Sequence, residues 1–515
     1  MSIVIIDGDS LTLEQARAVA HEGAEVGVAP AARRRIDEAR AYVDRIIAEE
    51  RVVYGITTGF GKFSDVTIAG SDVLELQRNL ILSHCCGVGE PLDAEKTGAL
   101  MLLRANVLAK GYSGARYVVL ETLVDMLNRG VLPVIPTRGS VGASGDLAPL
   151  AHLAAVIIGE GEAVWEGRRL SGREAMAAAG IAPLTLQAKE GLALINGTQF
   201  MTGIGLLALF KAETIAKCAD VACAMTLEAL RGTDAAYGPL THEVRPHPGQ
   251  VATAANLMRL LDGSEILPAH ADPSNDNKVQ DAYSLRCAPQ VHGAGKDALA
   301  YVRRVLEVEV NAATDNPLVF PEQDRVISGG NFHGQPISQA MDLLSIALSY
   351  TAGISERRIE YMLDPATSDH LPAFLTKWGG LHSGLMIAQV TAAALVSENK
   401  TLAHPASVDS IPTSANKEDY VSMGAYAARK ADDVCQNALT VLAVEFLCAA
   451  QALEFGGDLR PGRGVAAARR VIREHVAPLE RDRPQTPDIE SIAKLILDGD
   501  ILRAVEDAVG PLEMA

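Results

Sequence analysis

Aromatic residues are scarce in this chain of 515 residues: Phe, Trp and Tyr make up 4% of it, against 48% for all hydrophobic types. The core must therefore consist largely of Ala, Leu, Val and Ile. Long segments also lack proline. Aliphatic and small side chains in such segments favour helices over sheets. The chain is long enough to bury a large core and to form several domain-sized units.

Positively charged residues are also few, because the chain has 46 Lys and Arg against 64 Asp and Glu, which gives a net charge of −18. This balance argues against nucleic acid or an anionic membrane as a partner. The seven cysteines include no CxxC motif and indicate reduced cytoplasmic thiols. The N-terminus is too short and acidic for a signal peptide, and no run of about 18 uncharged apolar residues predicts a membrane span. The 12 histidines are scattered without an HExxH motif, so no metal site is predicted.

The first 200 residues mix short strands with helices. The patterns predict a strand at 4–6, a helix that Ser10 or Thr12 caps and that runs to Ala20, helices at 30–50, 71–84, 94–109 and 115–129, and a hairpin at 163–170. A loop rich in Gly and Thr occupies 55–70, and its glycines suggest a mobile lid.

Apolar stripes at helical spacing dominate the rest of the chain. One comprises Ile337, Met341, Leu344 and Leu348, and another Leu439, Leu442, Phe446, Ala449 and Leu453. We therefore predict a mainly α fold, in which a long central bundle (201–480) follows a smaller mixed N-terminal region (1–200) and precedes a helical tail (481–515). Stripes on more than one helix face suggest that the bundle continues into other subunits.

Ala143-Ser144-Gly145 are three very small residues in a row. In a tight turn, the unhindered amide nitrogen of Gly145 can approach the Ala143 carbonyl carbon and close a five-membered ring. Ring closure releases one water molecule, and the Ser144 side chain can lose a second. The product would be a methylidene-imidazolone (MIO), an electrophile made from the chain itself. The alternative is a Gly-rich loop that merely caps a helix, with Asp146 at the N-cap and Pro149 in the first turn.

Polar residues in Gly-flanked loops between apolar helices favour chemistry over capping. They are Tyr54 before the Gly-rich loop, Ser83-His84, Asn196-Gly197-Thr198, Gln280 to Arg286, and a C-terminal group with Phe332 and Glu418. Singly, each has a structural explanation, such as an ion pair or a helix-end histidine. Together they supply what an amino-acid site needs: Arg286 for a carboxylate, Tyr54 as base, Asn196, Gln280 and Tyr283 as donors, and His84 and Glu418 for a side chain.

The same segments carry a resemblance to a known family. The stretches Tyr54–Gly61, Gly142–Leu150, Asn196–Thr198, Gln280–Arg286 and Gly330–Gly334 resemble the aromatic amino-acid ammonia-lyase family, in order and spacing, over essentially the whole chain. The resemblance implies a mainly helical fold and an MIO cofactor formed from Ala143, Ser144 and Gly145, with no external cofactor. It also implies a homotetramer with active sites shared among three chains.

Within that family, Ser83-His84 is similar to the pair of the members that act on histidine, and Glu418 matches the position that meets the imidazole. The implied reaction converts L-histidine to trans-urocanate and ammonia. Tyr54 would remove the β-proton, Arg286 and Asn196 would hold the carboxylate, and Phe332 would form an apolar wall. Lys417 and Tyr420 depart from the residues of many members, Gln and His.

Other functions remain open at this point. A tyrosine or phenylalanine ammonia-lyase, or an MIO aminomutase that returns the ammonia to the β-carbon, could use the same scaffold. A non-catalytic helical scaffold is a further alternative, and a polypeptide mass lower by two waters would argue against it. The chain does not contain the signature motif of fumarase-type helical bundles.

Overall fold

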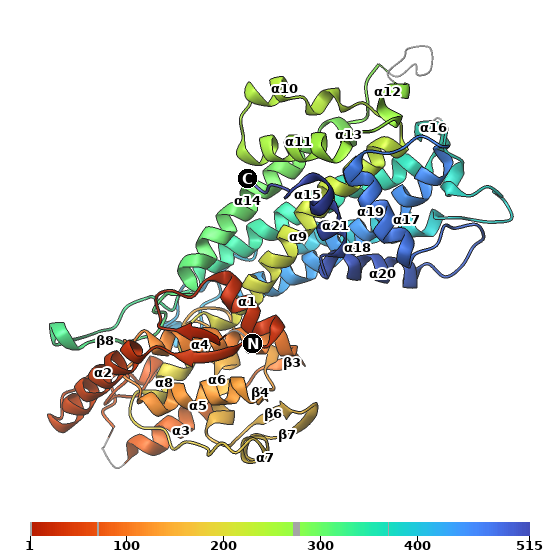
Figure 1. Ribbon diagram of the computed structural model, residues 1–515. Coiled ribbons are helices and arrows are strands. Elements are labelled where there is room, and N and C mark those ends of the chain that lie inside the picture. Colours follow the sequence, from red (N-terminus) through yellow and green to blue (C-terminus); the bar gives the residue numbers. More distant parts are fainter. Residues whose placement is uncertain (1–2, 69–71, 271–278, 369) are drawn as a thin grey trace. The chain divides into compact units, whose positions relative to one another are not determined.

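Helices dominate the computed structural model, which describes residues 3–68, 72–270, 279–368 and 370–515 (Figure 1). This confirms the mainly α fold. The chain forms two compact units. Unit 1 comprises Met1–Leu207, Arg304–Asp342 and Pro405–Arg429, and unit 2 comprises Ala208–Arg303, Leu343–His404 and Lys430–Ala515. Each unit thus combines stretches that lie far apart in the sequence, whereas the consecutive segments 1–200, 201–480 and 481–515 stay a prediction.

Unit 1 contains the mixed part of the chain. Its helices are α1 (Leu13–Glu22), α2 (Pro30–Ala48), α3 (Val73–His84), α4 (Ala94–Ala109), α5 (Tyr117–Asn128), α6 (Leu147–Ile157), α7 (Gly172–Ala178) and α8 (Glu190–Ile195). Its strands are β1 (Ile3–Ile6), β2 (Glu25–Val28), β3 (Val88–Pro91), β4 (Leu132–Pro133), β5 (Pro136–Arg138), β6 (Glu162–Trp165), β7 (Arg168–Ser171), β8 (Leu318–Phe320) and β9 (Arg325–Ile327). They form small sheets, β1-β2 parallel and β3-β5, β4-β6-β7 and β8-β9 antiparallel.

Local sequence signals account for several of these elements. The Thr12 hydroxyl accepts a hydrogen bond from the Gln15 amide, the Gln15 side chain accepts one from the Thr12 amide, and Gly23 ends α1 in the left-handed conformation. The hairpin β6-β7 turns at Glu166 and Gly167, both with positive φ, which is typical of a tight two-residue hairpin loop. The predicted cap at Thr12 and the predicted hairpin are both confirmed.

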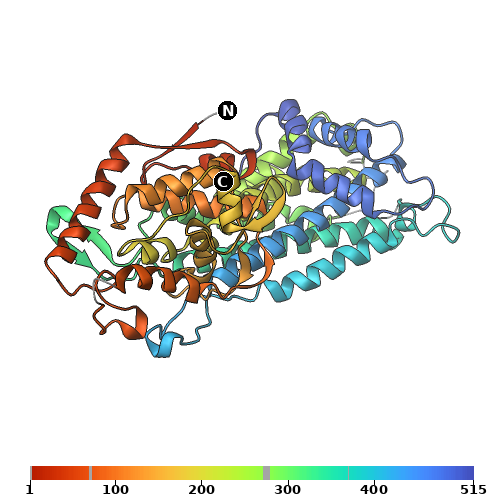
Figure 2. The same ribbon diagram turned by 90° about the horizontal axis from the view of Figure 1, so that it is seen from below.

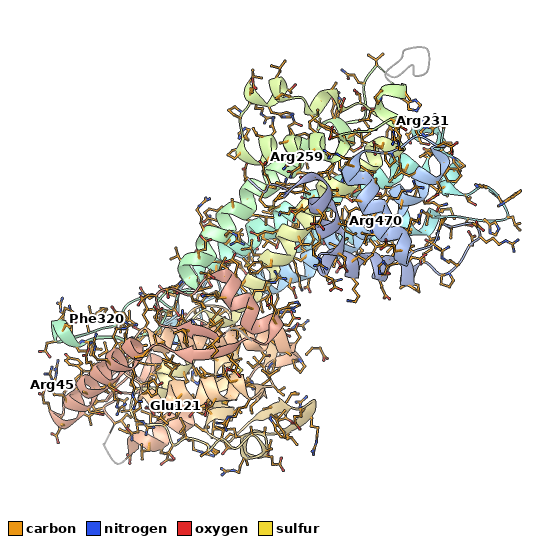
Figure 3. All side chains as sticks on the ribbon, viewed as in Figure 1. Arg45, Glu121, Arg231, Arg259, Phe320 and Arg470 are labelled. Atoms are coloured by element: carbon orange, nitrogen blue, oxygen red, sulfur yellow. The ribbon has the colours of Figure 1, made fainter. Side chains whose placement is uncertain are left out.

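The start of the Gly- and Thr-rich loop is anchored in a hydrophobic cluster. Ile56 is buried together with Tyr42 and Val43 of α2 and Val319 of β8. Beside this cluster the ring of Phe320, labelled in Figure 3, lies 5.2 Å from that of Tyr112. Because Ile56 is fixed in the core, the loop that follows Tyr54 begins from a defined position.

Unit 2 is helical in the residues that the structure describes. Its helices are α10 (Pro239–Glu243), α11 (Pro248–Leu261), α12 (Ile266–His270), α13 (Tyr283–Arg286), α16 (Pro365–Ser368), α17 (Met386–Leu402), α19 (Arg463–His475), α20 (Thr486–Leu497) and α21 (Asp500–Val509). The long helices α9 (Gln199–Ala229), α14 (Ala288–Glu309), α15 (Gln335–Leu363) and α18 (Gly424–Ala452) carry residues of both units.

The unit 2 parts of these long helices lie side by side, as both ribbon views show (Figures 1 and 2). Charged groups join them: His292 and Lys296 of α14 bind Asp220 of α9, and Arg358 of α15 binds Glu445 of α18, all of them buried. The two stripes predicted from the sequence are buried throughout. The bundle is therefore held by aliphatic packing with paired charges inside it.

One helical stretch among the described residues, Gly424–Phe455, is apolar and long enough to cross a bilayer by composition alone. In this fold, 83% of its most apolar window is buried inside the protein.

Candidate functional site

The Ala143-Ser144-Gly145 triplet lies in a tight turn. Gly142, which precedes the triplet, and Gly145, its last residue, have positive φ, at 66° and 72°. A Cβ at Gly145 would lie 2.1 Å from the carbonyl oxygen of Gly197, and one at Gly142 would lie 2.3 Å from the hydroxyl oxygen of Ser422. Both positions therefore require glycine. The Ser422 hydroxyl donates to the Gly142 carbonyl at 2.8 Å, which fixes the start of the turn.

Asp146 directly follows the triplet and is fully buried. It occupies the N-cap position of α6, as the sequence suggested, but its carboxylate makes no cap bond to that helix. It accepts instead from the Met201 amide in the first turn of α9, at 3.0 Å, and from the Ser140 hydroxyl, at 3.0 Å. Burial raises its pKa to about 7, despite these hydrogen bonds. Asp146 thus joins the end of the turn to a second helix.

Glu418 meets the triplet directly. The Ser144 hydroxyl donates to Glu418 Oε1 at 2.6 Å. The other carboxylate oxygen accepts from the hydroxyls of Thr413 at 2.6 Å and Ser414 at 2.9 Å. These two bonds hold the carboxylate with Oε1 turned towards residue 144, although the two residues lie 274 positions apart in the sequence.

His84 ends α3 close enough to Glu418 for their charges to interact. Burial lowers the pKa of His84, while its hydrogen bond with the Leu80 carbonyl and the charge of Glu418 act in the opposite direction. Its Nδ1 lies 2.8 Å from the Leu80 oxygen, which can only accept, so Nδ1 carries the hydrogen. Nε2 of the neutral ring is then an acceptor, and no described residue hydrogen-bonds it.

Tyr54 belongs to the same group. Burial raises the pKa of its phenol, the Gly61 amide lowers it by hydrogen bonding, and the charge of Glu418 raises it further. The short helix η1 (Gly61–Phe63) packs against η6 (Ser414–Asn416), which carries one of the hydroxyls that hold Glu418. The loop after Tyr54 therefore covers the segment that positions this carboxylate.

Asn196 and Phe332 complete the part of the site in unit 1. Asn196 is buried, its carbonyl accepts from the guanidinium of Arg104, and no described residue hydrogen-bonds its side-chain amide. Phe332 precedes Gly334, whose amide donates to the Gly142 carbonyl at 3.3 Å. The structure thus brings the NFHG segment to the triplet, with the Phe332 ring half-buried.

The other candidates lie in unit 2. Gln280 and Tyr283 are exposed, and Arg286 is half-buried. Tyr283 and Arg286 share the four-residue helix α13, as their spacing suggested, and the guanidinium carbon lies 4.5 Å from the ring centroid. Arg286 Nε donates to the Asp281 carbonyl. Their role in binding a substrate stays a prediction.

Sequence reasoning missed the residues that hold the functional groups in place. They are Ser140 and Ser422 around the turn, Thr413 and Ser414 behind Glu418, and Arg104 behind Asn196. All are small hydroxyl residues or a buried cation in ordinary-looking helices and loops. The partners of Ser422 and Arg104 are distant in the chain. Those of Ser140, Thr413 and Ser414 lie within six positions, but single hydroxyl residues are too common for that spacing to mark them.

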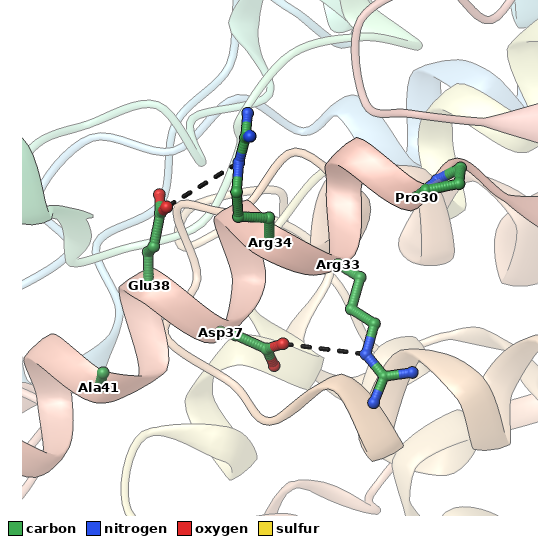
Figure 4. Close-up of a pocket in the computed structure, with 6 residues that line it drawn as sticks. All are labelled: Pro30, Arg33, Arg34, Asp37, Glu38 and Ala41. Carbon is green, nitrogen blue, oxygen red and sulfur yellow. Dashed lines mark ion pairs between the residues drawn. The ribbon is translucent and has the colours of Figure 1, made fainter.

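A surface hollow on α2 contains none of these residues (Figure 4). It is lined by Pro30, Arg33, Arg34, Asp37, Glu38 and Ala41, and it holds two pairs at i,i+4 spacing, Arg33–Asp37 at 3.8 Å and Arg34–Glu38 at 3.9 Å. Such exposed pairs contribute little to stability.

Comparison with known proteins identifies the family of the chain. A family model described as aromatic amino acid lyase matches residues 11–474. The chain belongs to the aromatic amino acid lyase family. The resemblance found in the sequence is therefore confirmed, and with it the expectation of a lyase scaffold.

Individual relatives in this lyase family match over nearly the full length. A protein of Alkaliphilus oremlandii (strain OhILAs) named histidine ammonia-lyase is 55% identical over 509 residues, 99% of each chain. The crystal structure of histidine ammonia-lyase from Trypanosoma cruzi is 44% identical, with a TM-score of 0.91 and coverage of 98% and 96%. The crystal structure of tyrosine aminomutase from Streptomyces globisporus is 40% identical, with a TM-score of 0.93 and coverage of 99% and 100%. The family fold alone therefore does not separate lyases from aminomutases.

Proposed function

We propose that this chain deaminates L-histidine without oxidation, to trans-urocanate and ammonia. The observation that carries the proposal is the group formed by Ser144, Glu418 and His84, in which Glu418 bonds the Ser144 hydroxyl and interacts with the His84 ring. The name of the 55% identical relative supports the same substrate.

Hydrogen-bond complementarity favours an imidazole over the rings of phenylalanine or tyrosine. His84 Nε2 and Glu418 both offer acceptors to a ligand. A protonated imidazole carries two N–H donors, a phenol carries one donor and a phenyl ring carries none. A buried acceptor that a ligand leaves unpaired costs about 1–3 kcal/mol. His84 and Glu418 would therefore discriminate most strongly against phenylalanine, whose ring has no donor for either acceptor.

The turn around Ser144 suits the formation of MIO. Its two glycines adopt conformations that other residues rarely reach, and contacts to Ser422 and Gly197 hold it compact. Once formed, the group would supply an electrophile that makes the substrate amine a better leaving group. Loss of the Ser144 hydroxyl would also free Glu418 Oε1, its present acceptor, for the substrate ring.

The remaining steps fall to side chains of the protein. Tyr54, as phenolate, would take the β-proton, and the side-chain amide of Asn196 would donate to the substrate. Phe332 would exclude water beside the turn. Arg286 would hold the carboxylate, with Tyr283 and Gln280 as polar neighbours. The family resemblance implies active sites that are built from three chains of a homotetramer. We therefore propose that Arg286, Tyr283 and Gln280 reach the substrate from another copy of the chain. We also propose a cytoplasmic location, which the seven free cysteines support.

An assay that follows urocanate absorbance, with histidine, tyrosine and phenylalanine in parallel, tests the substrate. The mass of the intact purified chain tests MIO, because ring closure and dehydration remove two waters. We expect Ser144→Ala to abolish turnover while the protein stays folded. Near-normal turnover in that variant, or a wild-type mass equal to that of the unmodified chain, would refute the proposal.

An aminomutase is the second candidate, favoured by the likeness to tyrosine aminomutase. An aminomutase would release a β-amino acid from the same reaction mixture. Chromatography of the products with authentic standards separates the two, since a lyase yields urocanate and ammonia in equal amounts.

A further inference from the structure

Two adjacent cysteines follow the candidate substrate-binding residue His84. Cys85 is half-buried and Cys86 is exposed. Cys287 is also half-buried, whereas Cys218, Cys223, Cys435 and Cys448 are buried. The pair at the end of α3 (Figure 1) thus offers two neighbouring thiols at the surface of unit 1. Neither has a role in the proposed deamination.

The backbone around this pair is held in one conformation. Cys85 adopts φ −74° and ψ 67°, and the Cys86 amide donates to the His84 carbonyl at 2.9 Å. Those dihedral angles and that bond define an inverse γ-turn. The Gly87 amide donates to His152 Nε2 at 3.2 Å, which fixes the chain on the other side. The two thiols therefore lie on a short segment that is anchored at both ends.

The two sulfurs differ in reactivity. Burial raises the pKa of Cys85 to about 11, and the neighbouring Cys86 raises it as well. Cys86 is in contact with solvent, so its thiolate is the more accessible nucleophile. An incoming electrophile would react at Cys86 first and at Cys85 second.

The spacing of the backbone determines whether Cys85 and Cys86 favour a direct disulfide or a bridge through an additional atom. Adjacent Cα atoms are about 3.8 Å apart, below the range of about 4.4–6.8 Å usual for disulfides. A direct sulfur–sulfur bond would therefore be strained. One additional atom between the sulfurs relieves this strain, and thiolates prefer soft centres.

We propose that Cys85 and Cys86 form a binding site for trivalent arsenicals. With an arsenoxide, R–As=O, two arsenic–sulfur bonds form, the arsenic–oxygen bond breaks, and the oxygen leaves with the two thiol protons as one water. Arsenic keeps its oxidation state, so the step needs no oxidant or reductant.

Binding at this site would act on His84 through the γ-turn. An arsenic bridge between the two sulfurs would restrain ψ of Cys85. This restraint would lengthen the hydrogen bond that the Cys86 amide donates to the His84 carbonyl. This effect rests on the proposed function, in which His84 binds the substrate ring. Loss of about one hydrogen bond to the ring corresponds to a rise in KM of about tenfold, with a smaller change in kcat.

The test uses the purified full-length protein and phenylarsine oxide. We expect one adduct per chain, with the mass of the reagent less one water, and digestion should place it on the peptide that contains both cysteines. A dithiol should remove it, and a monothiol at the same thiol concentration should not. An adduct on a different peptide would overturn the proposal, and this mapping needs no variant.

Variants sharpen the result. Cys86→Ser and Cys85→Ser should each lose the dithiol-sensitive adduct, and the matched control Cys287→Ser should retain it. Basal turnover and the thermal midpoint of Cys86→Ser should match the wild type, and Cys86→Ala serves if the serine variant is unstable. Retention of the bridged adduct without Cys86 would refute the site.

Kinetics separate this inference from the proposed function. L-histidine should slow adduct formation, and the adduct should raise KM for L-histidine. A mapped adduct in a protein that does not deaminate histidine would support the thiol site and refute the proposed function.

A deaminase whose KM is unchanged by the mapped adduct would refute the coupling to His84. A disulfide that hydrogen peroxide forms faster than the arsenical adduct would overturn the strain argument.

Discussion

Two neutral side chains and one carboxylate define the site at the scale of single residues. Burial favours the uncharged forms of both Tyr54 and His84, whereas Glu418 is held by two hydroxyls with its remaining oxygen towards Ser144. A phenol is a poor base unless it ionises, and its ordinary pKa is about 10. With Tyr54 as the proposed base, we expect activity to be highest in the pH range where Tyr54 begins to lose its proton.

We expect Tyr54→Phe to lower kcat by about 100- to 10,000-fold, the usual effect of removing a general base. Because burial raises the pKa of Tyr54, wild-type turnover should increase with pH through the neutral range and beyond. Steady-state rates between neutral and alkaline pH measure both effects. Tyr112→Phe, which changes a phenol packed against Phe320, is the control and should remain active. A Tyr54→Phe enzyme with wild-type kcat would exclude the phenol as base.

Glu418→Gln tests the proposed role of Glu418 as partner of the substrate ring. An amide keeps the shape of the side chain but loses its charge, so we expect a large loss of histidine turnover with little change in the thermal midpoint. The exposed neighbour Asp419→Asn is the matched control. A large fall in both turnover and midpoint would instead assign Glu418 a structural role.

At the scale of elements, the turn depends on helices that meet behind it. Asp146 begins α6 and binds the first turn of α9. Its pKa is about 7 in the folded protein, against 3.8 for an unperturbed group. Between these values the folded chain retains a proton that the unfolded chain has lost. The contribution of Asp146 to the free energy of unfolding must therefore fall as the pH rises through this window.

Asp146→Asn removes this titration while it preserves the size of the side chain. We expect the variant to gain stability relative to the wild type as the pH rises from about 4 to about 7, with no further change above that range. Thermal or urea unfolding at several pH values measures the difference. A constant difference across the window would show that Asp146 titrates normally. The intact mass of the variant, compared with that of the wild type, reports separately on whether the proposed MIO forms.

At the scale of the whole molecule, the question is how many chains build one site. The candidates divide between the two units, with Tyr54 in unit 1 and Arg286 in unit 2. If the sites of a homotetramer are shared, Tyr54 and Arg286 of one site come from different copies. Two inactive variants can then complement each other.

Tyr54→Phe and Arg286→Ala should each be inactive alone and partly active when co-expressed. With random mixing of equal amounts, about a quarter of the shared sites contain both native side chains. Activity of the co-expressed pair, with each variant alone as the control, measures this. No recovery in a mixed oligomer, shown by two different affinity tags, would place both residues in one chain. Light scattering of the wild type gives the oligomeric state.

The sequence by itself determined what depends on local chemistry and on periodicity. The Thr12 cap, the turn at Glu166 and Gly167, helix α4 at residues 94–109 and the buried stripe of α15 all follow from neighbours within a few positions. The Ala143-Ser144-Gly145 triplet and the family could likewise be recognised from the sequence, because a run of residues in fixed order encodes them.

Only the tertiary structure decided which distant groups meet. Ser144 and Glu418 are 274 positions apart, and Asp146 binds the start of α9 from 55 positions away, so neither contact leaves a periodic trace in the sequence. Nor does a short motif specify burial, which raises the pKa of Asp146 to about 7. Hydrogen bonding and desolvation act through space, so they exist only once the chain has folded and brought those atoms together.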